Sequence, residues 1–146
     1  MTDFELLPHM ADMKLRVYGK DLSALFAHAV IGMFQSIRPH VPDCEVVHGR
    51  VVCKELPISR EVDLTASQVS LLLVDFLSQA LYLSDVYNEA YFDVQIHEIS
   101  PTHISATLQG VAIKGFESVE IKAVTYHDLV VEAVADGWQA EIVFDI

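Results

Sequence analysis

The sequence predicts an α+β fold in a single domain over residues 1–146. The predicted elements run strand, helix, strands, helix, strands, and few connections are suited to be parallel crossovers. The pair Asp136-Gly137 between two alternating runs is a strong hairpin signal. Together these observations favour mostly antiparallel or mixed β-sheet, with two long amphipathic helices packed on it.

The N-terminal part predicts two strands and the first helix. Residues 4–7 begin a short strand, and residues 12–18 alternate between polar and apolar side chains. Asp21 then provides an N-cap for a helix. Over residues 22–37 apolar side chains recur at spacings of three and four, and Pro39 prevents much continuation. The inner face of the second strand is expected to hold Met13, Leu15 and Val17.

The middle of the chain predicts a strand pair and the second helix. Residues 45–55 and 59–64 are typical of strands, and we expect them to pair across the Leu56-Pro57 break. The run Thr65-Ala-Ser-Gln68 has the pattern of a capping box, in which the Thr and Gln side chains satisfy backbone amides. Apolar side chains at helical spacing follow over residues 69–83.

The C-terminal part predicts only strands. Residues 91–99 and 103–110 form a pair around a turn, and residues 120–146 hold three more strands, the last two flanking Asp136-Gly137. Each half of the chain thus has strand, helix and strands, which is compatible with an internal strand-helix-strand repeat. The inner face of the last strand is expected to hold Trp138, Ala140, Ile142, Phe144 and Ile146.

Composition limits the classes of protein to consider. With 146 residues, 52% of them hydrophobic and 21% charged, the chain is typical of a globular domain. A formal net charge of −12 is unsuited to a phosphate backbone, so we expect no direct binding of nucleic acid. The uninterrupted apolar runs fall short of the ~20 residues that cross a bilayer, and the N-terminus lacks the features of a signal peptide. We therefore expect a cytoplasmic protein without a membrane span.

The two cysteines, Cys44 and Cys53, are nine positions apart and lack CxxC spacing. Such a pair can bridge a hairpin. A cytoplasmic protein, however, favours the reduced form, so we expect two free thiols.

The sharpest group of candidate ligands is acidic. Asp12 begins the second strand, and Asp145 and Ile146 finish the last one, where Ile146 brings its α-carboxylate. Three hard oxygen anions suit Ca²⁺ or Mg²⁺ rather than Zn²⁺. Neighbouring side chains on a strand point to opposite faces, but an α-carboxylate continues the backbone and escapes that rule. The alternative is that Asp12 caps a turn and Asp145 is simply solvated.

Four stretches carry a resemblance to a known family. In chain order they are His9-Met-Ala-Asp12, Leu72-Leu-Val-Asp-Phe-Leu77 before Leu81-Tyr-Leu83, Lys122-Ala-Val-Thr-Tyr-His127, and Phe144-Asp145-Ile146. They resemble the archease family, the accessory factor of the RtcB-type tRNA-splicing RNA ligase, over essentially the whole chain. The resemblance implies a non-catalytic protein that promotes guanylylation of the ligase, the step in which GTP and metal load its active-site histidine. It also implies multiple turnover of the ligase and use of a broader range of nucleoside triphosphates.

The resemblance also implies roles for single residues. Asp12, Asp145 and Ile146 match positions that bind a divalent cation, assigned as calcium, with Mg²⁺ or Mn²⁺ as other candidates. Lys122 matches a lysine important for activity, which pairs with a carboxylate or contacts the ligase; the alternative is a surface lysine at a sheet edge. The matched motifs also contain His9 and His127, each a proton shuttle or a partner near the cation, or else a hydrogen-bonded structural residue.

Two other functions stay open. One is a metal-dependent phosphoester hydrolase that uses Asp12, Asp145 and a base such as His127. The other is a general chaperone-like binding module. The sequence contains no phosphate-binding loop, dinucleotide fingerprint or nucleophile elbow, which argues against a self-sufficient nucleotide-using enzyme. Asp75 also matches an acidic residue of the family and is suited to cap or pair internally.

Overall fold

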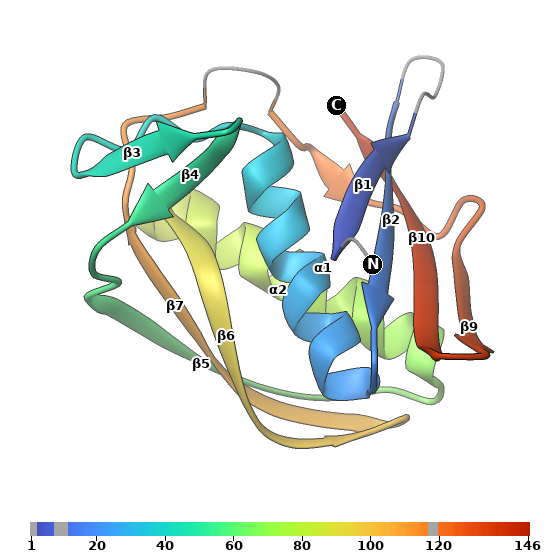
Figure 1. Cartoon of the computed structure of the whole chain (residues 1–146). Helices are drawn as coiled ribbons and strands as arrows, with labels where there is room; N and C mark the ends of the chain where they lie inside the picture. The colour runs from blue at the N-terminus through green and yellow to red at the C-terminus, as the bar shows by residue number, and fades with distance from the viewer. Residues whose placement is uncertain (1–2, 8–11, 117–119) are drawn as a thin grey trace.

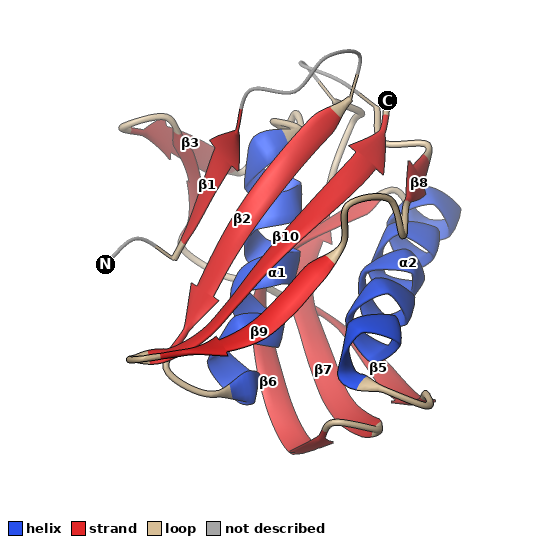
Figure 2. Ribbon diagram, turned by 90° about the vertical axis from the view of Figure 1, so that its right-hand side faces the viewer, coloured by secondary structure: helices blue, strands red, loops and turns tan. Residues whose placement is uncertain are grey.

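The computed structural model describes residues 3–7, 12–116 and 120–146, and in it both helices lie between two β-sheets (Figure 1; Figure 2). This arrangement confirms the α+β class and the two packed helices. The elements in chain order are β1 (Phe4–Leu7), β2 (Met13–Gly19), α1 (Leu22–Ser36), β3 (Cys44–Val47), β4 (Arg50–Cys53), β5 (Ile58–Thr65), α2 (Val69–Tyr87), β6 (Glu89–Ser100), β7 (His103–Ala112), β8 (Ala123–Val124), β9 (Val130–Val134) and β10 (Gly137–Asp145).

The first sheet is antiparallel and is centred on β10. Its strand order is β1-β2-β10-β8, and β9 pairs with β10 on the same side as β8. The predicted hairpin forms between β9 and β10. Gly137, which begins β10, has a φ of 142°, and a Cβ atom there would lie 2.2 Å from the carbonyl oxygen of Gly19. Both the conformation and the close approach therefore require glycine.

The inner face of this sheet covers α1. Side chains of β2 alternate as predicted, with Met13, Leu15 and Val17 all buried. On β10 the matching inner residues are buried from Ala140 to Phe144, but Ile146 is 39% exposed. The prediction that Ile146 belongs to the core is wrong, because β10 ends at Asp145 and the last residue lies beyond the sheet.

The second sheet is three-stranded and antiparallel, with the order β5-β7-β6. It confirms the predicted pair β6–β7. The prediction that residues 45–55 pair with residues 59–64 is wrong, because β3 pairs with β4 and β5 pairs with β7. The reason is the turn His48-Gly49, where φ is 49° and 79°. Positive φ at both central residues is typical of a two-residue hairpin turn, which folds this stretch back on itself.

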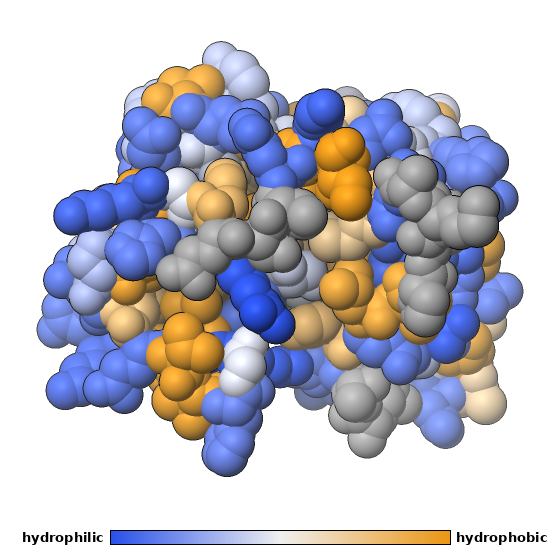
Figure 3. All heavy atoms as spheres, turned by 90° about the horizontal axis from the view of Figure 1, so that it is seen from above, coloured by the Kyte–Doolittle hydropathy of each residue, from blue (hydrophilic) through white to orange (hydrophobic). Residues whose placement is uncertain are grey.

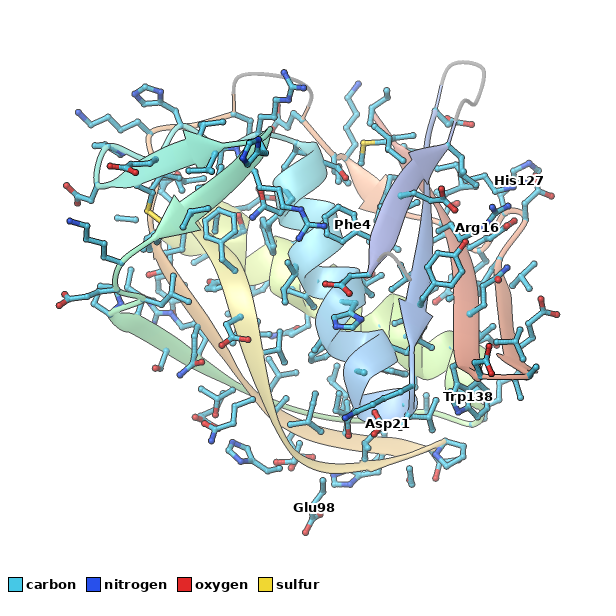
Figure 4. All side chains as sticks on the ribbon, viewed as in Figure 1. Phe4, Arg16, Asp21, Glu98, His127 and Trp138 are labelled. Atoms are coloured by element: carbon cyan, nitrogen blue, oxygen red, sulfur yellow. A yellow bond between two sulfur atoms is a disulfide. The ribbon has the colours of Figure 1, made fainter. Side chains whose placement is uncertain are left out.

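The two helices begin differently. Asp21 caps α1 as predicted, since its Oδ1 atom accepts a hydrogen bond from the backbone N–H of Ala24 at 2.8 Å (Figure 4). The predicted capping box of α2 is wrong, because the N-cap is Gln68 without a side-chain cap bond. Thr65 instead stays in β5, opposite His103.

Helix α2 is long and apolar enough to cross a membrane by length and composition alone, although polar residues interrupt its apolar runs. A core helix gives the same signal. Its apolar stripe is buried between the two sheets (Figure 2). The buried residues of α2 are Leu72, Leu73, Val74, Phe76, Leu77, Ala80, Leu81 and Ser84.

The two cysteines form a disulfide, so the prediction of free thiols is wrong. Cys44 and Cys53 stand directly opposite each other in the β3–β4 pair, with their Cα atoms 4.5 Å apart. That separation lies in the range that a disulfide spans. The turn at His48-Gly49 sets this register and thereby brings the two sulfur atoms together.

Candidate metal-binding end of the central strands

The outer face of β1, β2 and β10 carries a network of charged side chains. Arg16 is at its centre and donates from Nε to Glu141 at 2.9 Å and from a terminal nitrogen to Glu5 at 3.2 Å (Figure 4). The Tyr18 hydroxyl donates to Glu5 at 2.7 Å, and Lys14 Nζ lies 3.3 Å from Glu141. Residues that stand opposite across the strand pairs thus interact through their side chains.

These contacts favour the ionised form of Glu141 and the neutral form of Tyr18. The hydrogen bond from Arg16 is the main cause of the lowered pKa of Glu141, and Lys14 contributes as well. The hydrogen bond to Glu5 is the main cause of the raised pKa of Tyr18. Arg16 and Lys14 therefore have carboxylate partners inside the network.

The strand register brings the two predicted acidic residues toward each other. The β2–β10 pairing runs from Gly19↔Trp138 to Met13↔Phe144. Asp12 directly precedes β2 and Asp145 ends β10, so the pairing brings both residues to the same end of these two neighbouring strands.

Lys122 lies at the same end of β10. Its backbone N–H donates to the carbonyl oxygen of Asp145 at 2.8 Å, and the next residue, Ala123, pairs with Asp145. The prediction that Lys122 lies within a strand is wrong, because β8 covers only Ala123–Val124. The side chain of Lys122 is exposed at this sheet edge. The structure thus brings together Lys122 and Asp145, with Ile146 directly following.

Of the two candidate histidines, the structure describes only His127. His127 lies in the turn between β8 and β9, with 69% of its side chain exposed, and its Nε2 atom lies 3.3 Å from Asp128 (Figure 4). His9 lies outside the described residues. Asp75 is half-buried on α2.

Within residues 3–7, 12–116 and 120–146, no three His, Cys, Asp or Glu side chains cluster in a way that holds a metal ion. The predicted set differs from such a cluster, because it combines two aspartate side chains with one main-chain carboxylate. The chemistry of the set is that of a hard cation, since every donor is a carboxylate oxygen. Asp145 is exposed and Asp12 is half-buried, so solvent reaches this end of the strands.

A second polar cluster was missed by the sequence analysis. Glu89, at the start of β6, accepts two hydrogen bonds from Arg60 at 2.9 and 2.8 Å and one from the Tyr91 hydroxyl at 2.8 Å. Arg60 also stacks over the ring of Tyr87 at 3.7 Å. The one signal in the sequence is an acidic residue directly after a long helix, at the start of an apolar strand.

Known proteins similar to this chain identify its family. A family model described as the archease protein family (MTH1598/TM1083) matches residues 4–146. The chain belongs to the archease family. Among relatives named protein archease, that of Methanosarcina acetivorans is 36% identical over 151 residues, covering 98% of this chain and 95% of the relative. That of Pyrococcus furiosus is 31% identical over 156 residues, covering 100% of both.

Solved structures agree with this membership of the archease family. The solution structure of Methanobacterium thermoautotrophicum protein 1598 has a TM-score of 0.74 and 26% identity, with 100% of both chains covered. A crystal structure from Thermotoga maritima, described as an archease and possible chaperone, has a TM-score of 0.61 and 18% identity, covering 96% of this chain and 94% of that one. At that identity the second likeness supports the fold alone.

Proposed function

We propose that this archease activates an RtcB-type RNA ligase by promoting its guanylylation, multiple turnover and use of several nucleoside triphosphates. Family membership over residues 4–146 supports this function. The observation that carries it is the meeting of Lys122 and Asp145 at one end of β10, where the strand register also directs Asp12. Lys122 and Asp145 are joined at this end of β10, and Asp12 directly precedes the strand beside it.

In this proposal Asp12, Asp145 and the α-carboxylate of Ile146 hold a divalent cation. Carboxylate oxygens are the preferred ligands of Ca²⁺ and Mg²⁺, and Mn²⁺ accepts them as well. Calcium suits the set best, because it tolerates irregular geometry and fills the rest of its shell with water. When bound, the cation supplies positive charge at an otherwise acidic chain end.

The proposed role is that of a protein cofactor rather than a catalyst. The ligase performs the chemistry, and the archease docks through the end of β10 to order groups around the guanylylation site. Lys122 is suited to contact the ligase, because its side chain is exposed next to Asp145. The net charge of −12 favours encounter with the basic, RNA-binding face of a ligase in the cytoplasm, without direct contact with RNA.

The experiment is single-turnover guanylylation of the ligase with wild-type archease, Asp145→Asn and a matched control, Asp136→Asn. Asp136 is exposed in the turn at the opposite end of β10, so its substitution removes the same charge far from the site. We expect Asp145→Asn to lose about tenfold in stimulation, the order of effect seen when a metal site is disturbed, and the control to retain it.

Equal stimulation by all three proteins would remove Asp145 from the mechanism. Stimulation that is lost in both variants would mean that net charge, rather than the cation site, matters. Phosphoester hydrolysis by the isolated archease that depends on Asp145 would instead favour the hydrolase alternative.

A further inference from the structure

The hairpin β3–β4 stands apart from both main sheets and carries the disulfide. It forms a two-stranded sheet of its own beside the end of α1 (Figure 1). Cys44 lines a cavity of about 310 Å³, which we call the hairpin pocket. Arg38 and His40, from the segment after α1, line it as well. This pocket is separate from the candidate cation site at the end of β10.

The lining of the hairpin pocket favours thiol chemistry. Arg38 contributes a permanent positive charge to the lining of the pocket that Cys44 also lines, and His40 adds a second nitrogen-bearing side chain. Positive charge near a cysteine stabilises its thiolate, which is both the reactive form and the better leaving group. The only acidic residue in the described lining is Glu45. Cys44 is therefore in a better environment for exchange than a disulfide exposed among carboxylates.

We propose that the Cys44–Cys53 disulfide is a thiol-exchange site, and that the hairpin pocket admits a small carboxylate-bearing thiol of the glutathione class. The thiolate of the small molecule attacks Cys44 Sγ and forms a mixed disulfide there, while the bond to Cys53 breaks and Cys53 leaves as a thiolate that takes up a proton. A second small thiol attacks its counterpart in the mixed disulfide. Cys44 is then released as a thiol and the two small molecules are oxidised to their own disulfide.

Opening the disulfide removes one of the contacts that fix β3 to the rest of the protein. Strand β4 is anchored to α1, because the Gln35 side chain donates to the Val51 carbonyl at 2.9 Å and accepts from the Val51 N–H at 2.8 Å. Arg50, also on β4, lies 4.5 Å from the ring centroid of Phe4. In the described part of the chain, β3 has the β4 ladder, the disulfide and one long bond, from Cys44 N–H to the Val41 carbonyl at 3.3 Å.

A two-stranded hairpin is marginally stable by itself, so breaking the disulfide loosens β3 more than β4. The apolar side chains of β3 are already exposed, with Val46 at 73% and Val47 at 42%, whereas the buried Val51 lies on β4. Seen from above, the molecule shows hydrophobic side chains in separate patches among hydrophilic ones (Figure 3). Release of β3 therefore does not open the main core, which the two larger sheets enclose.

The test compares the full-length chain with the variants Cys53→Ser and Cys44→Ser, each of which keeps one thiol. The reduced proteins are treated with oxidised glutathione, and intact mass spectrometry follows formation of the mixed disulfide. We expect Cys44, in Cys53→Ser, to react about fivefold faster than Cys53, in Cys44→Ser. Adding Arg38→Gln to Cys53→Ser should remove most of that advantage, whereas Arg60→Gln, outside the pocket, should not.

The wild-type disulfide provides a readout that needs no variant. Reduced glutathione at millimolar concentration should open it in the native protein, and hydrogen exchange should then rise in residues 44–47 more than in residues 50–53. Equal rates for the two single-thiol variants, or no effect of Arg38→Gln, would overturn the assignment of the pocket. A native disulfide that opens only after unfolding would overturn the exchange site itself.

Discussion

Glu89 and Asp145 are both acidic residues at the end of a strand, and their surroundings are opposite. Glu89 begins β6, and only 5% of its side chain is exposed. Its two carboxylate oxygens accept hydrogen bonds from Arg60 and Tyr91. Asp145 ends β10 with an exposed side chain, and the bond that fixes its position uses its main-chain oxygen instead.

The hydrogen bonding of Glu89 is that of a structural carboxylate, whereas the exposed carboxylate of Asp145 is available to a ligand. The hydrogen bonds from Arg60 are the main cause of the lowered pKa of Glu89, outweighing the opposite effect of burial. Burial raises the pKa of Tyr91, and the hydrogen bond to Glu89 raises it further. The acceptors of Glu89 are thus occupied by protein donors. At Asp145 the main chain is fixed while the carboxylate faces solvent, which is what a cation site requires.

The largest expected effect is on the stability of the fold and concerns the buried carboxylate, Glu89. Glu89→Ala leaves the hydroxyl of the fully buried Tyr91 without its acceptor and removes the partner of Arg60. We expect a loss of about 3 kcal/mol in the free energy of unfolding, near the lower end for a broken buried pair because Arg60 is partly exposed. Glu89→Gln should cost about 1–2 kcal/mol, since the amide oxygen still accepts from Tyr91.

Urea denaturation at neutral pH measures both values. Glu98→Ala is the matched control, because Glu98 is on the same strand, points away from the fold and has 74% of its side chain exposed (Figure 4). An exposed substitution should change the unfolding free energy by no more than about 0.5 kcal/mol. If Glu89→Ala and Glu98→Ala are equally stable, the Arg60–Glu89–Tyr91 cluster does not stabilise the fold.

The next effect is on the pH dependence of stability: the free energy of unfolding should fall as the solution becomes more acidic. The pKa of Glu89 is lower in the folded protein than its ordinary value of 4.5. Its contribution is therefore fully present above that value and is lost as the pH falls through the folded-state pKa. Glu141, whose pKa is also lowered, acts in the same direction. We expect wild type to lose about 1–2 kcal/mol more than Glu89→Gln between neutral pH and about pH 3.

Denaturation curves of both proteins over that range provide the measurement. The stability difference between them should be constant above about pH 5 and shrink at lower pH. Glu141→Gln should give a smaller change, because 17% of the Glu141 side chain is exposed to solvent, against 5% of the Glu89 side chain. Parallel curves for wild type and Glu89→Gln would show that Glu89 binds its proton equally in both states.

Local patterns explain why much of the fold was predictable. Alternation on β2 and β10 and the three-four spacing on α1 and α2 depend only on neighbouring residues, and the structure follows these patterns except near the end of β10, where Val143 is buried and Ile146 is exposed. Partner choice between distant strands depends on the whole fold, so the pairing of β5 with β7 could not be read from either strand alone. The same holds for the cluster around Glu89, which joins residues from β5, β6 and the end of α2.

The disulfide is an intermediate case. A turn centred on His48-Gly49 pairs residues at equal distances on either side, and Cys44 and Cys53 are one such pair. The signal was therefore present in the sequence, but the expected reducing compartment outweighed it. At the candidate site, the motifs identified Lys122 and Asp145, whereas the main-chain bond between them depends on how β8 meets β10.

The smallest expected effect concerns cation affinity at the exposed member of the comparison. Adding residues after Ile146 converts its α-carboxylate into a neutral amide, while Asp12 and Asp145 keep their charges. We expect the affinity for Ca²⁺, measured by calorimetry, to fall about tenfold, or about 1.4 kcal/mol. Asp145→Asn should weaken binding to a similar degree, because each change removes one anionic donor from the set.

Measuring the free energy of unfolding distinguishes a loss of Ca²⁺ affinity from a destabilised fold. Ile146 lies beyond the last strand and is 39% exposed, so the extension should leave the unfolding free energy within about 0.5 kcal/mol of wild type. The same residues added before Met1 provide the control and should leave Ca²⁺ affinity unchanged. Unchanged affinity after the C-terminal extension would exclude Ile146 as a ligand. The extended variant keeps the side chains of Asp12 and Asp145. If it binds Ca²⁺ as tightly as wild type while Asp145→Asn binds more weakly, the two aspartates hold the cation without Ile146.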